Sequence, residues 1–123
     1  MTRAVVVLAC LVVAAIAGTA GAEQLRPRPT DSLNRLYYLY GVALECGLAD
    51  DAVMRGFVLA ANEIVVSRGL TEVSIRATRI QAWIAVDLEW SNRGLGGYRN
   101  WCRTEGAGAA DLFRAVNDAV PPP

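Results

Sequence analysis

The chain has 123 residues with 12 basic and 12 acidic side chains, and therefore no formal net charge. All the basic residues are arginines, and histidine is absent. A near-neutral chain lacks the basic face that nucleic-acid binding needs. The absence of histidine excludes Ser-His-Asp and Cys-His catalysis and removes the commonest metal ligand. We therefore expect a protein without a nucleic-acid partner, metal or cofactor.

The first 22 residues have the pattern of a cleaved export signal. Arg3 supplies a positive start, residues 4–17 form an uncharged apolar run, and residues 20–22 are small. We place the cleavage site between Ala22 and Glu23. An uncleaved anchor is the alternative, but the run is shorter than the roughly 20 residues of a membrane-spanning helix. Export predicts a periplasmic or secreted protein with no membrane span after cleavage.

Removal of the first 22 of 123 residues leaves 101, with 11 arginines against 12 acidic residues. A chain of this length forms one small domain with little stability to spare. Residues 23–30 contain Pro27 and Pro29 and predict an extended lead-in. We expect the helical domain over residues 31–120 and a proline tail at residues 121–123.

Two helices are predicted in the first half of the domain. Asp31 or Ser32 caps the first, whose apolar residues recur at three- and four-residue spacing until Gly47 stops it. Asp50-Asp51 begins the second, where negative charge favours the helix N-terminus, and Gly69 ends it. The core residues expected on the second helix are Val53, Met54, Phe57, Val58, Ala61, Ile64 and Val65.

The strongest helical periodicity begins at Thr71. The residues expected to form its core-facing stripe are Val73, Ala77, Ile80, Ile84, Leu88, Ser91, Leu95, Tyr98 and Cys102. Glycines at positions 94, 96 and 97 interrupt the pattern, and each costs roughly 1 kcal/mol relative to alanine in a helix. We expect a break between Asn92 and Gly97, which separates two segments, about Glu72–Asn92 and Gly97–Arg103.

The last predicted helix spans Asp111–Val120 and follows a Gly/Ala linker at Glu105–Ala109. Its expected core face consists of Leu112, Ala115, Val116 and Ala119. No segment alternates with a period of two between turn signals, so no sheet is predicted. The sequence thus predicts an all-α fold, a small antiparallel bundle of about four helices with one disulfide.

The cysteines support that disulfide. Cys10 lies in the export signal, which leaves Cys46 and Cys102 to pair. There is no CxxC motif, so a thioredoxin-like redox site and the usual zinc sites lack their residues. A structural bond is the simplest interpretation, and closing this loop is worth about 4 kcal/mol in the unfolded-state model. A redox-active or intermolecular pair is the alternative.

All three tryptophans fall on one side of the third predicted helix, if that helix continues through the glycines. Tryptophan and arginine are favoured as binding anchors. The candidate binding face consists of Trp83, Asp87, Trp90, Arg93 and Trp101. The alternative is that these rings belong to the core, as aromatic stripes at helical spacing usually do.

The chain resembles a family of short exported alphaproteobacterial proteins of uncharacterised function. The resemblance covers about residues 33–118 and rests on Leu36-Tyr37-Tyr38-Leu39 leading to Cys46, and on Asn92-Arg93-Gly94 leading to Tyr98 and Cys102. It implies a location in the cell envelope and supplies no activity.

We expect a non-enzymatic helical protein that binds another envelope protein, as an assembly factor, accessory subunit or chaperone-like module. The alternative is a carrier of a small ligand or lipid, with an apolar cavity lined by Tyr37, Phe57 and Trp83. A carboxylate-only hydrolase comes third. Buried carboxylates can be catalytic, but the many arginines favour structural ion pairs. We therefore predict no catalytic residue.

Overall fold

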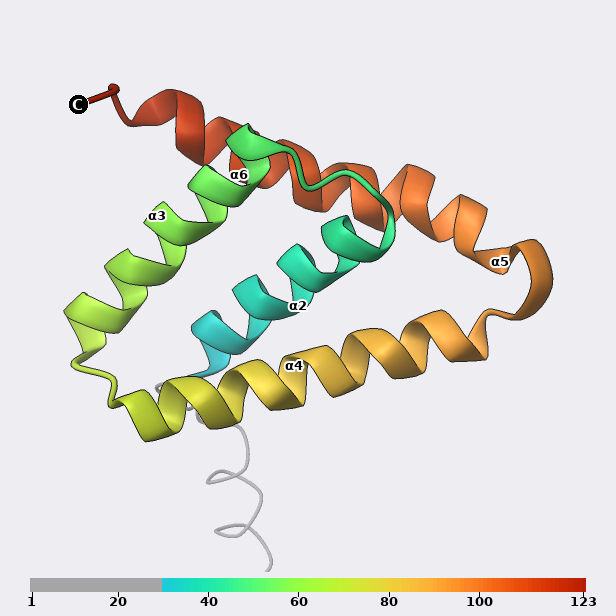
Figure 1. Cartoon of the computed structure of the whole chain (residues 1–123), viewed down its shortest axis with the longest axis horizontal. Coiled ribbons are helices and arrows are strands. Elements are labelled where there is room, and N and C mark those ends of the chain that lie inside the picture. Colours follow the sequence, from blue (N-terminus) through green and yellow to red (C-terminus); the bar gives the residue numbers. More distant parts are fainter. Residues whose placement is uncertain (1–29) are drawn as a thin grey trace, which may run out of the picture.

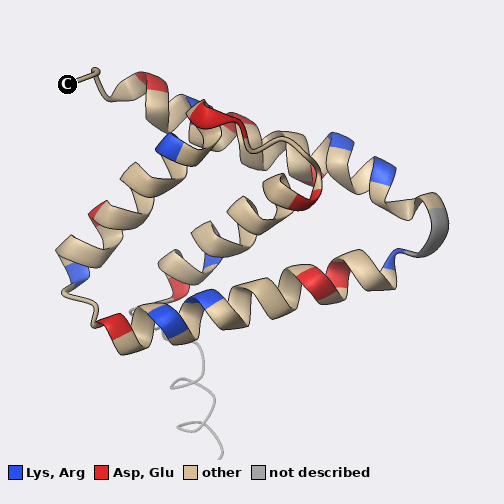
Figure 2. Cartoon of the chain, viewed as in Figure 1, with Lys and Arg blue, Asp and Glu red and all other residues tan. Residues whose placement is uncertain are grey.

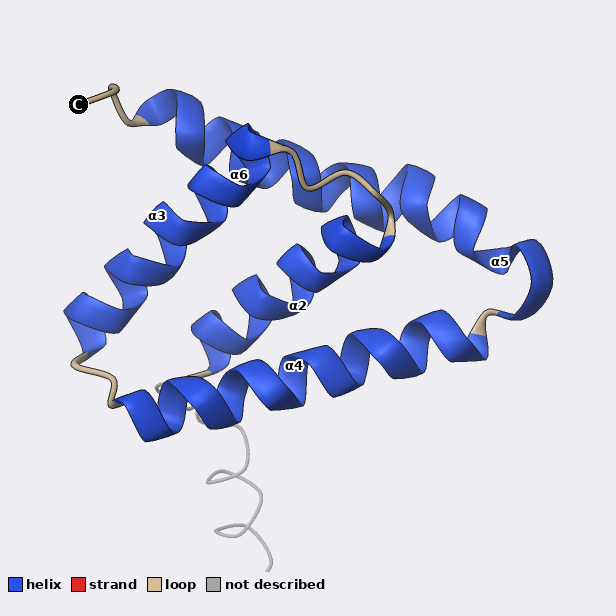
Figure 3. Ribbon diagram, viewed as in Figure 1, coloured by secondary structure: helices blue, strands red, loops and turns tan. Residues whose placement is uncertain are grey.

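The computed structural model describes residues 30–123, apart from the side-chain surroundings at positions 94 and 95. The predicted export signal and residues 23–29 of the lead-in lie outside this range. Helices follow one another along the described chain with no strand (Figures 1 and 3). They are α2 (Asp31–Glu45), α3 (Asp51–Arg68), α4 (Glu72–Asn92), α5 (Gly94–Trp101), the π-helical turn η1 (Cys102–Gly106) and α6 (Ala107–Ala119). The predicted all-α bundle is confirmed.

The helix ends follow local chemistry. The Asp50 carboxylate accepts a hydrogen bond of 3.0 Å from the Val53 amide at the start of α3, and Thr71 caps α4 through Ser74. Gly69 ends α3 with a φ of 58°, in the left-handed region that glycine adopts without strain. The predicted cap of α2 is wrong, because α2 begins after Thr30, whose side chain makes no capping hydrogen bond.

The predicted break after Asn92 is confirmed. Helix α4 ends at Asn92, and α5 begins at Gly94. Gly96 has a φ of 85°, which an L side chain rarely adopts. The chain reverses here, so α5, η1 and α6 run back in the opposite direction to α4, with α2 between the two arms (Figure 1).

The predicted linker at Glu105–Ala109 is wrong, because the chain stays helical through η1 into α6. The small residues serve close packing there. Gly106 lies against Cys46, and Ala109 and Ala110 are buried. The buried face of α6 therefore consists of Ala109, Ala110 and Phe113, and the predicted face is mostly exposed.

The main core lies between α2, α3 and α6. The Phe57 ring stacks on Tyr40 with 4.2 Å between ring centres and meets Phe113 edge-on at 5.7 Å. Leu33 and Val53 are completely buried in the same cluster. Met54 and Val58, predicted for the core, lie on the exposed side of α3. A second cluster of Val42, Val86 and Trp101 lies at the disulfide end.

The apolar stripe predicted to bury α4 points outward. Val73, Ile80, Ile84 and Leu88 are 79%, 49%, 55% and 56% exposed. The buried residues of α4 are the smaller Thr78, Ala82 and Val86, which pack towards α2. Gly41 of α2 is so close to Val86 that an added Cβ would lie 2.8 Å from its Cγ2. Small residues at the contact allow this close approach, and the larger ones are left outside.

Helices α3 and α6 also approach closely, at Gly56. The effect of adding one methyl group there can be predicted from this contact. A Cβ added at Gly56 would lie 1.8 Å from the carbonyl oxygen of Phe113. We expect Gly56→Ala to force the helices apart and to lower the free energy of unfolding by about 3 kcal/mol or more. Urea unfolding followed by circular dichroism measures this change.

The matched control is Gly108→Ala on α6, where an added Cβ meets nothing within 4 Å. There the better helix propensity of alanine should raise the free energy of unfolding by up to about 1 kcal/mol. Equal unfolding midpoints for the two variants would contradict the proposed role of Gly56.

Candidate functional site

The disulfide marks one end of the molecule. Cys46 follows the last residue of α2 and Cys102 begins η1, with 5.3 Å between their Cα atoms. The predicted pairing is confirmed. Gly106 lies over the bond, where an added Cβ would lie 2.8 Å from Cys46 Sγ. Disulfides are typical of proteins in oxidising compartments.

Three aromatic rings gather beside the disulfide. Trp90 of α4 lies 5.1 Å from Tyr98 and 6.2 Å from Trp101, measured between ring centres. Trp101 is only 2% exposed. The Arg93 guanidinium lies over the Trp101 ring at 4.8 Å, within the range of a cation–π contact. This cluster fixes the return of the chain from α4 into α5.

Two carboxylates complete the cluster. Glu89 accepts a hydrogen bond of 2.8 Å from Arg93 in an ion pair, and Glu105 accepts one of 2.7 Å from the Trp101 indole nitrogen. The Tyr38 hydroxyl also donates to Glu105. Burial, followed by the nearby negative charge of Glu105, raises the pKa of Tyr38 from 10.0 to about 12. Glu105 thereby ties η1 to α2 through Tyr38 and to the end of α5 through Trp101.

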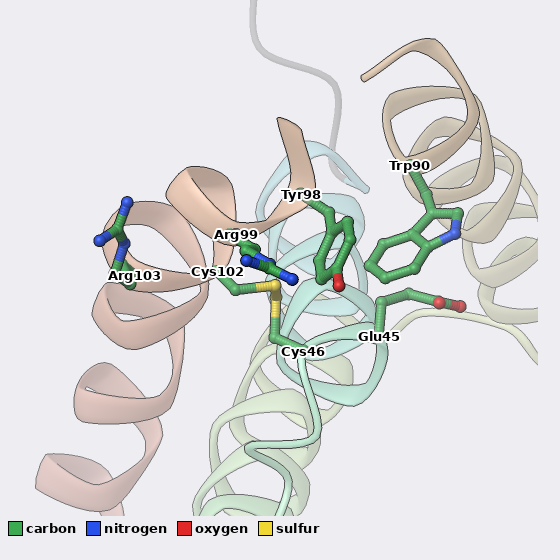
Figure 4. Close-up of a pocket in the computed structure, with 7 residues that line it drawn as sticks. All are labelled: Glu45, Cys46, Trp90, Tyr98, Arg99, Cys102 and Arg103. Carbon is green, nitrogen blue, oxygen red and sulfur yellow. A yellow bond between two sulfur atoms is a disulfide. The ribbon is translucent and has the colours of Figure 1, made fainter. Parts of the chain in front are cut away.

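Two neighbouring cavities open on this side of α2. The first, of about 530 Å³, is lined by Glu45, Cys46, Trp90, Tyr98, Arg99, Cys102 and Arg103. Figure 4 shows the Trp90 and Tyr98 rings side by side near Glu45. The second, of about 290 Å³, lies between α2 and α4 and is lined by Gly41, Leu44, Glu45, Trp83 and Val86. Glu45 belongs to both cavities.

The predicted binding face does not form one surface. Trp83 and Trp90 each line a cavity, and Asp87 is exposed on α4. Arg93 lies over the Trp101 ring. Arg93 also pairs with Glu89, and Trp101 donates to Glu105. The face is divided because the chain reverses after Asn92, so α5 does not continue the register of α4.

Leu44 was missed as a site residue by sequence reasoning. Glu45 was considered from the sequence as a buried carboxylate, for which an ion pair with an arginine was expected, but it is exposed and forms no ion pair within residues 30–123. Glu105 was missed because it was placed in a linker, although it follows Trp101 at the i+4 spacing that brings side chains together on a helix.

The chemistry of this end of the molecule rests on aromatic, guanidinium and carboxylate groups. Within residues 30–123, no three side chains of the metal-ligating types come together. No helix in that range is long and apolar enough to cross a membrane. Comparisons with protein families, curated proteins and solved structures find no match for this chain.

The disulfide should contribute a large part of the stability. Its 56-residue separation closes a loop whose lost entropy in the unfolded chain is worth about 4 kcal/mol. We expect Cys46→Ala with Cys102→Ala to lower the free energy of unfolding by about that amount, measured by urea unfolding. Reduction of the unaltered protein should give the same loss, and an unchanged midpoint in either case would contradict the role.

Tyr38 should make the fold sensitive to alkali. Its pKa is raised from 10.0 to about 12, so the folded protein keeps a proton that the unfolded chain releases. The resulting stabilisation is complete below pH 10 and is lost as the pH rises towards 12. When phenolate absorbance is measured against pH, one tyrosine should ionise at a higher pH than expected for an exposed tyrosine, and Tyr38→Phe should remove this late component of the titration. The fall in the free energy of unfolding above pH 10 should be smaller in that variant. Persistence of the late component would contradict the assignment.

Proposed function

We propose that this protein is a non-enzymatic binding protein of the cell envelope, an assembly factor, accessory subunit or chaperone-like module. It holds a segment of another envelope protein in the groove between α2 and α4. The observation that carries this proposal is the pair Leu44 and Trp83, each 48% exposed, at the cavity between these helices. Half-exposed large apolar side chains beside a cavity are typical of protein-binding surfaces.

The envelope location is supported by two observations. Residues 1–22 have the pattern of an export signal. The Cys46–Cys102 bond suits the oxidising conditions met after export. The resemblance of residues 33–118 to a family of short exported proteins agrees with this location.

The groove is preorganised for an apolar side chain. Gly41 and Val86 are buried and line it, while Leu44 and Trp83 are its exposed apolar members. The Arg79 guanidinium lies 5.4 Å from the centre of the Trp83 ring and restrains it. A restrained tryptophan loses little conformational entropy when a partner contacts it, which favours binding.

The charges around the groove specify its partner further. Glu45 lines both cavities and has no ion-pair partner within residues 30–123. Arg99 and Arg103 line the first cavity, of about 530 Å³, beside the disulfide. The expected partner segment has a leucine or aromatic side chain for the groove, a basic residue opposite Glu45 and an acidic residue towards Arg99.

A small-ligand carrier is the second candidate, supported by the cavity of about 530 Å³ beside the disulfide. That volume is in the range of small-molecule sites. Its aromatic rings and arginines suit an anionic amphiphile. The cavity residues predicted for a carrier do not come together. Tyr37 and Phe57 contact each other in the main core, whereas Trp83 lines the other cavity. A small molecule in native mass spectra of the purified protein would favour this candidate.

Groove variants should lose the protein partner and keep the fold. We expect Leu44→Ala and Trp83→Ala each to reduce capture of the partner from envelope extract by about tenfold, as anchor residues do. The control is Val66→Ala on α3, which removes an 80% exposed apolar side chain outside both cavities. The partner is quantified by mass spectrometry and has to be a protein other than this chain. Equal capture by all the variants would contradict the groove.

A further inference from the structure

The outward side of α4 carries an apolar stripe with no covering element within residues 30–123. Val73, Ala77, Ile80 and Ile84 are exposed and recur at spacings of four, three and four residues, and Leu88 follows one turn later. The first four residues have the spacing of the apolar seam by which two helices pair side by side, and the next position at that spacing is Asp87. The stripe lies opposite Thr78, Ala82 and Val86, which pack towards α2. It is therefore a helix face available for another helix.

The charges beside the stripe are arranged with opposite signs at its two ends. Arg76 and Asp87 are eleven residues apart, about three helical turns, so both lie along the same edge of the stripe. Along α4 the acidic Glu72 comes first, Arg76 and Arg79 follow it, and the acidic Asp87 and Glu89 lie towards the end of the helix (Figure 2). Within the described chain, the ion pair of Arg76 is with the exposed Glu72, at 3.4 Å, and Asp87 has no ion-pair partner.

We propose that α4 is the interface of a two-fold homodimer in which the α4 helices of two copies pack antiparallel. An antiparallel pair centred between Ile80 and Ile84 places each of these residues opposite the other in the second copy. Equivalent edges face each other in this arrangement, so Arg76 of each copy meets the partner's Asp87, and the charge pair forms twice. In a parallel two-fold pair each edge would instead face the other edge of the partner helix, so Arg76 and Asp87 would not meet and the charge pair would be lost.

The same charges favour a second copy over a membrane surface. Helices that lie on membranes carry a basic polar face, whereas this stripe has one basic and one acidic residue along its edge. The proposed dimer goes beyond the proposed function, because it is built on the outward stripe of α4 and not on the groove between α4 and α2. Trp83 of the groove lies one turn before Asp87, so the two proposed interfaces share one edge of α4.

The test is the molar mass of the protein purified from cells that express the full chain, measured by sedimentation over a range of concentrations. We expect a dimer for the unaltered protein and a monomer for Ile84→Glu, which places charge in the centre of the stripe. Because Ile84 is 55% exposed, circular dichroism and the unfolding midpoint of the Ile84→Glu monomer should stay close to those of the unaltered protein.

Charge reversal tests the antiparallel register without removing an apolar residue. Arg76→Glu and Asp87→Arg should each raise the dimer dissociation constant by about tenfold, because two pairs are lost per dimer. The double variant should restore the original value, and salt should weaken the unaltered dimer. Glu63→Arg on α3 reverses an exposed charge that lines neither cavity and should leave the constant unchanged.

Several outcomes would overturn the proposal. A monomer at every concentration, a dimer insensitive to Ile84→Glu, or a double charge reversal that fails to rescue would each do so. A monomer that sediments with phosphatidylglycerol–phosphatidylethanolamine vesicles through the same stripe would assign the face to a membrane surface instead. The groove proposal is tested separately, because Leu44→Ala changes the groove and not the stripe. A change in partner capture by this variant therefore says nothing about the dimer, and a failure of the dimer proposal leaves the groove proposal standing.

Discussion

The return of the chain beside α2 is the constraint on which the rest of the structure depends. Helix α2 packs against α4 on one side and against α6 on the other, while α3 packs against α6. The Cys46–Cys102 bond joins the end of α2 to the π-helical turn that precedes α6. Without that connection, the arm formed by α5, η1 and α6 would be held only by noncovalent contacts, at a large entropic cost for so small a domain.

Small residues decide how closely the helices approach. Gly41 against Val86, Gly56 against Phe113 and Gly106 against Cys46 are three contacts in which an added methyl group would collide with the neighbouring helix. At two of these places the partner is a backbone carbonyl or a disulfide sulfur, which cannot rotate away as a flexible side chain can. The domain therefore gains much of its packing from backbone proximity rather than from large interlocking side chains.

Local chemistry made much of the fold predictable. Asp50, Thr71 and Gly69 stop or start helices through their own hydrogen bonds or dihedral angles, and the break after Asn92 follows from three glycines close together. The orientation of α4 was not predictable in this way. Periodicity shows which residues share a face, but the close contact between Gly41 and Val86 determines which face turns inward.

The candidate site was predictable only in part for the same reason. Trp83 and Trp90 lie beside cavities, whereas Trp101 is in the core, because the chain reverses between them. A reversal of direction depends on contacts with residues distant in sequence. Glu105 accepts hydrogen bonds from Tyr38 and Trp101. Tyr38 is distant in sequence, and only the packing of η1 on α2 brings it to Glu105.

The contact between α3 and α6 also imposes an order on assembly. Phe57 meets Phe113, which lies 56 residues further along the chain, near its C-terminal end. A chain that emerges N-terminus first from a ribosome or a translocation channel presents α3 long before α6 exists to cover it. The part of α3 that α6 covers is therefore open to water, or to a protecting chaperone, while the residues from Gly69 to Ala119 emerge.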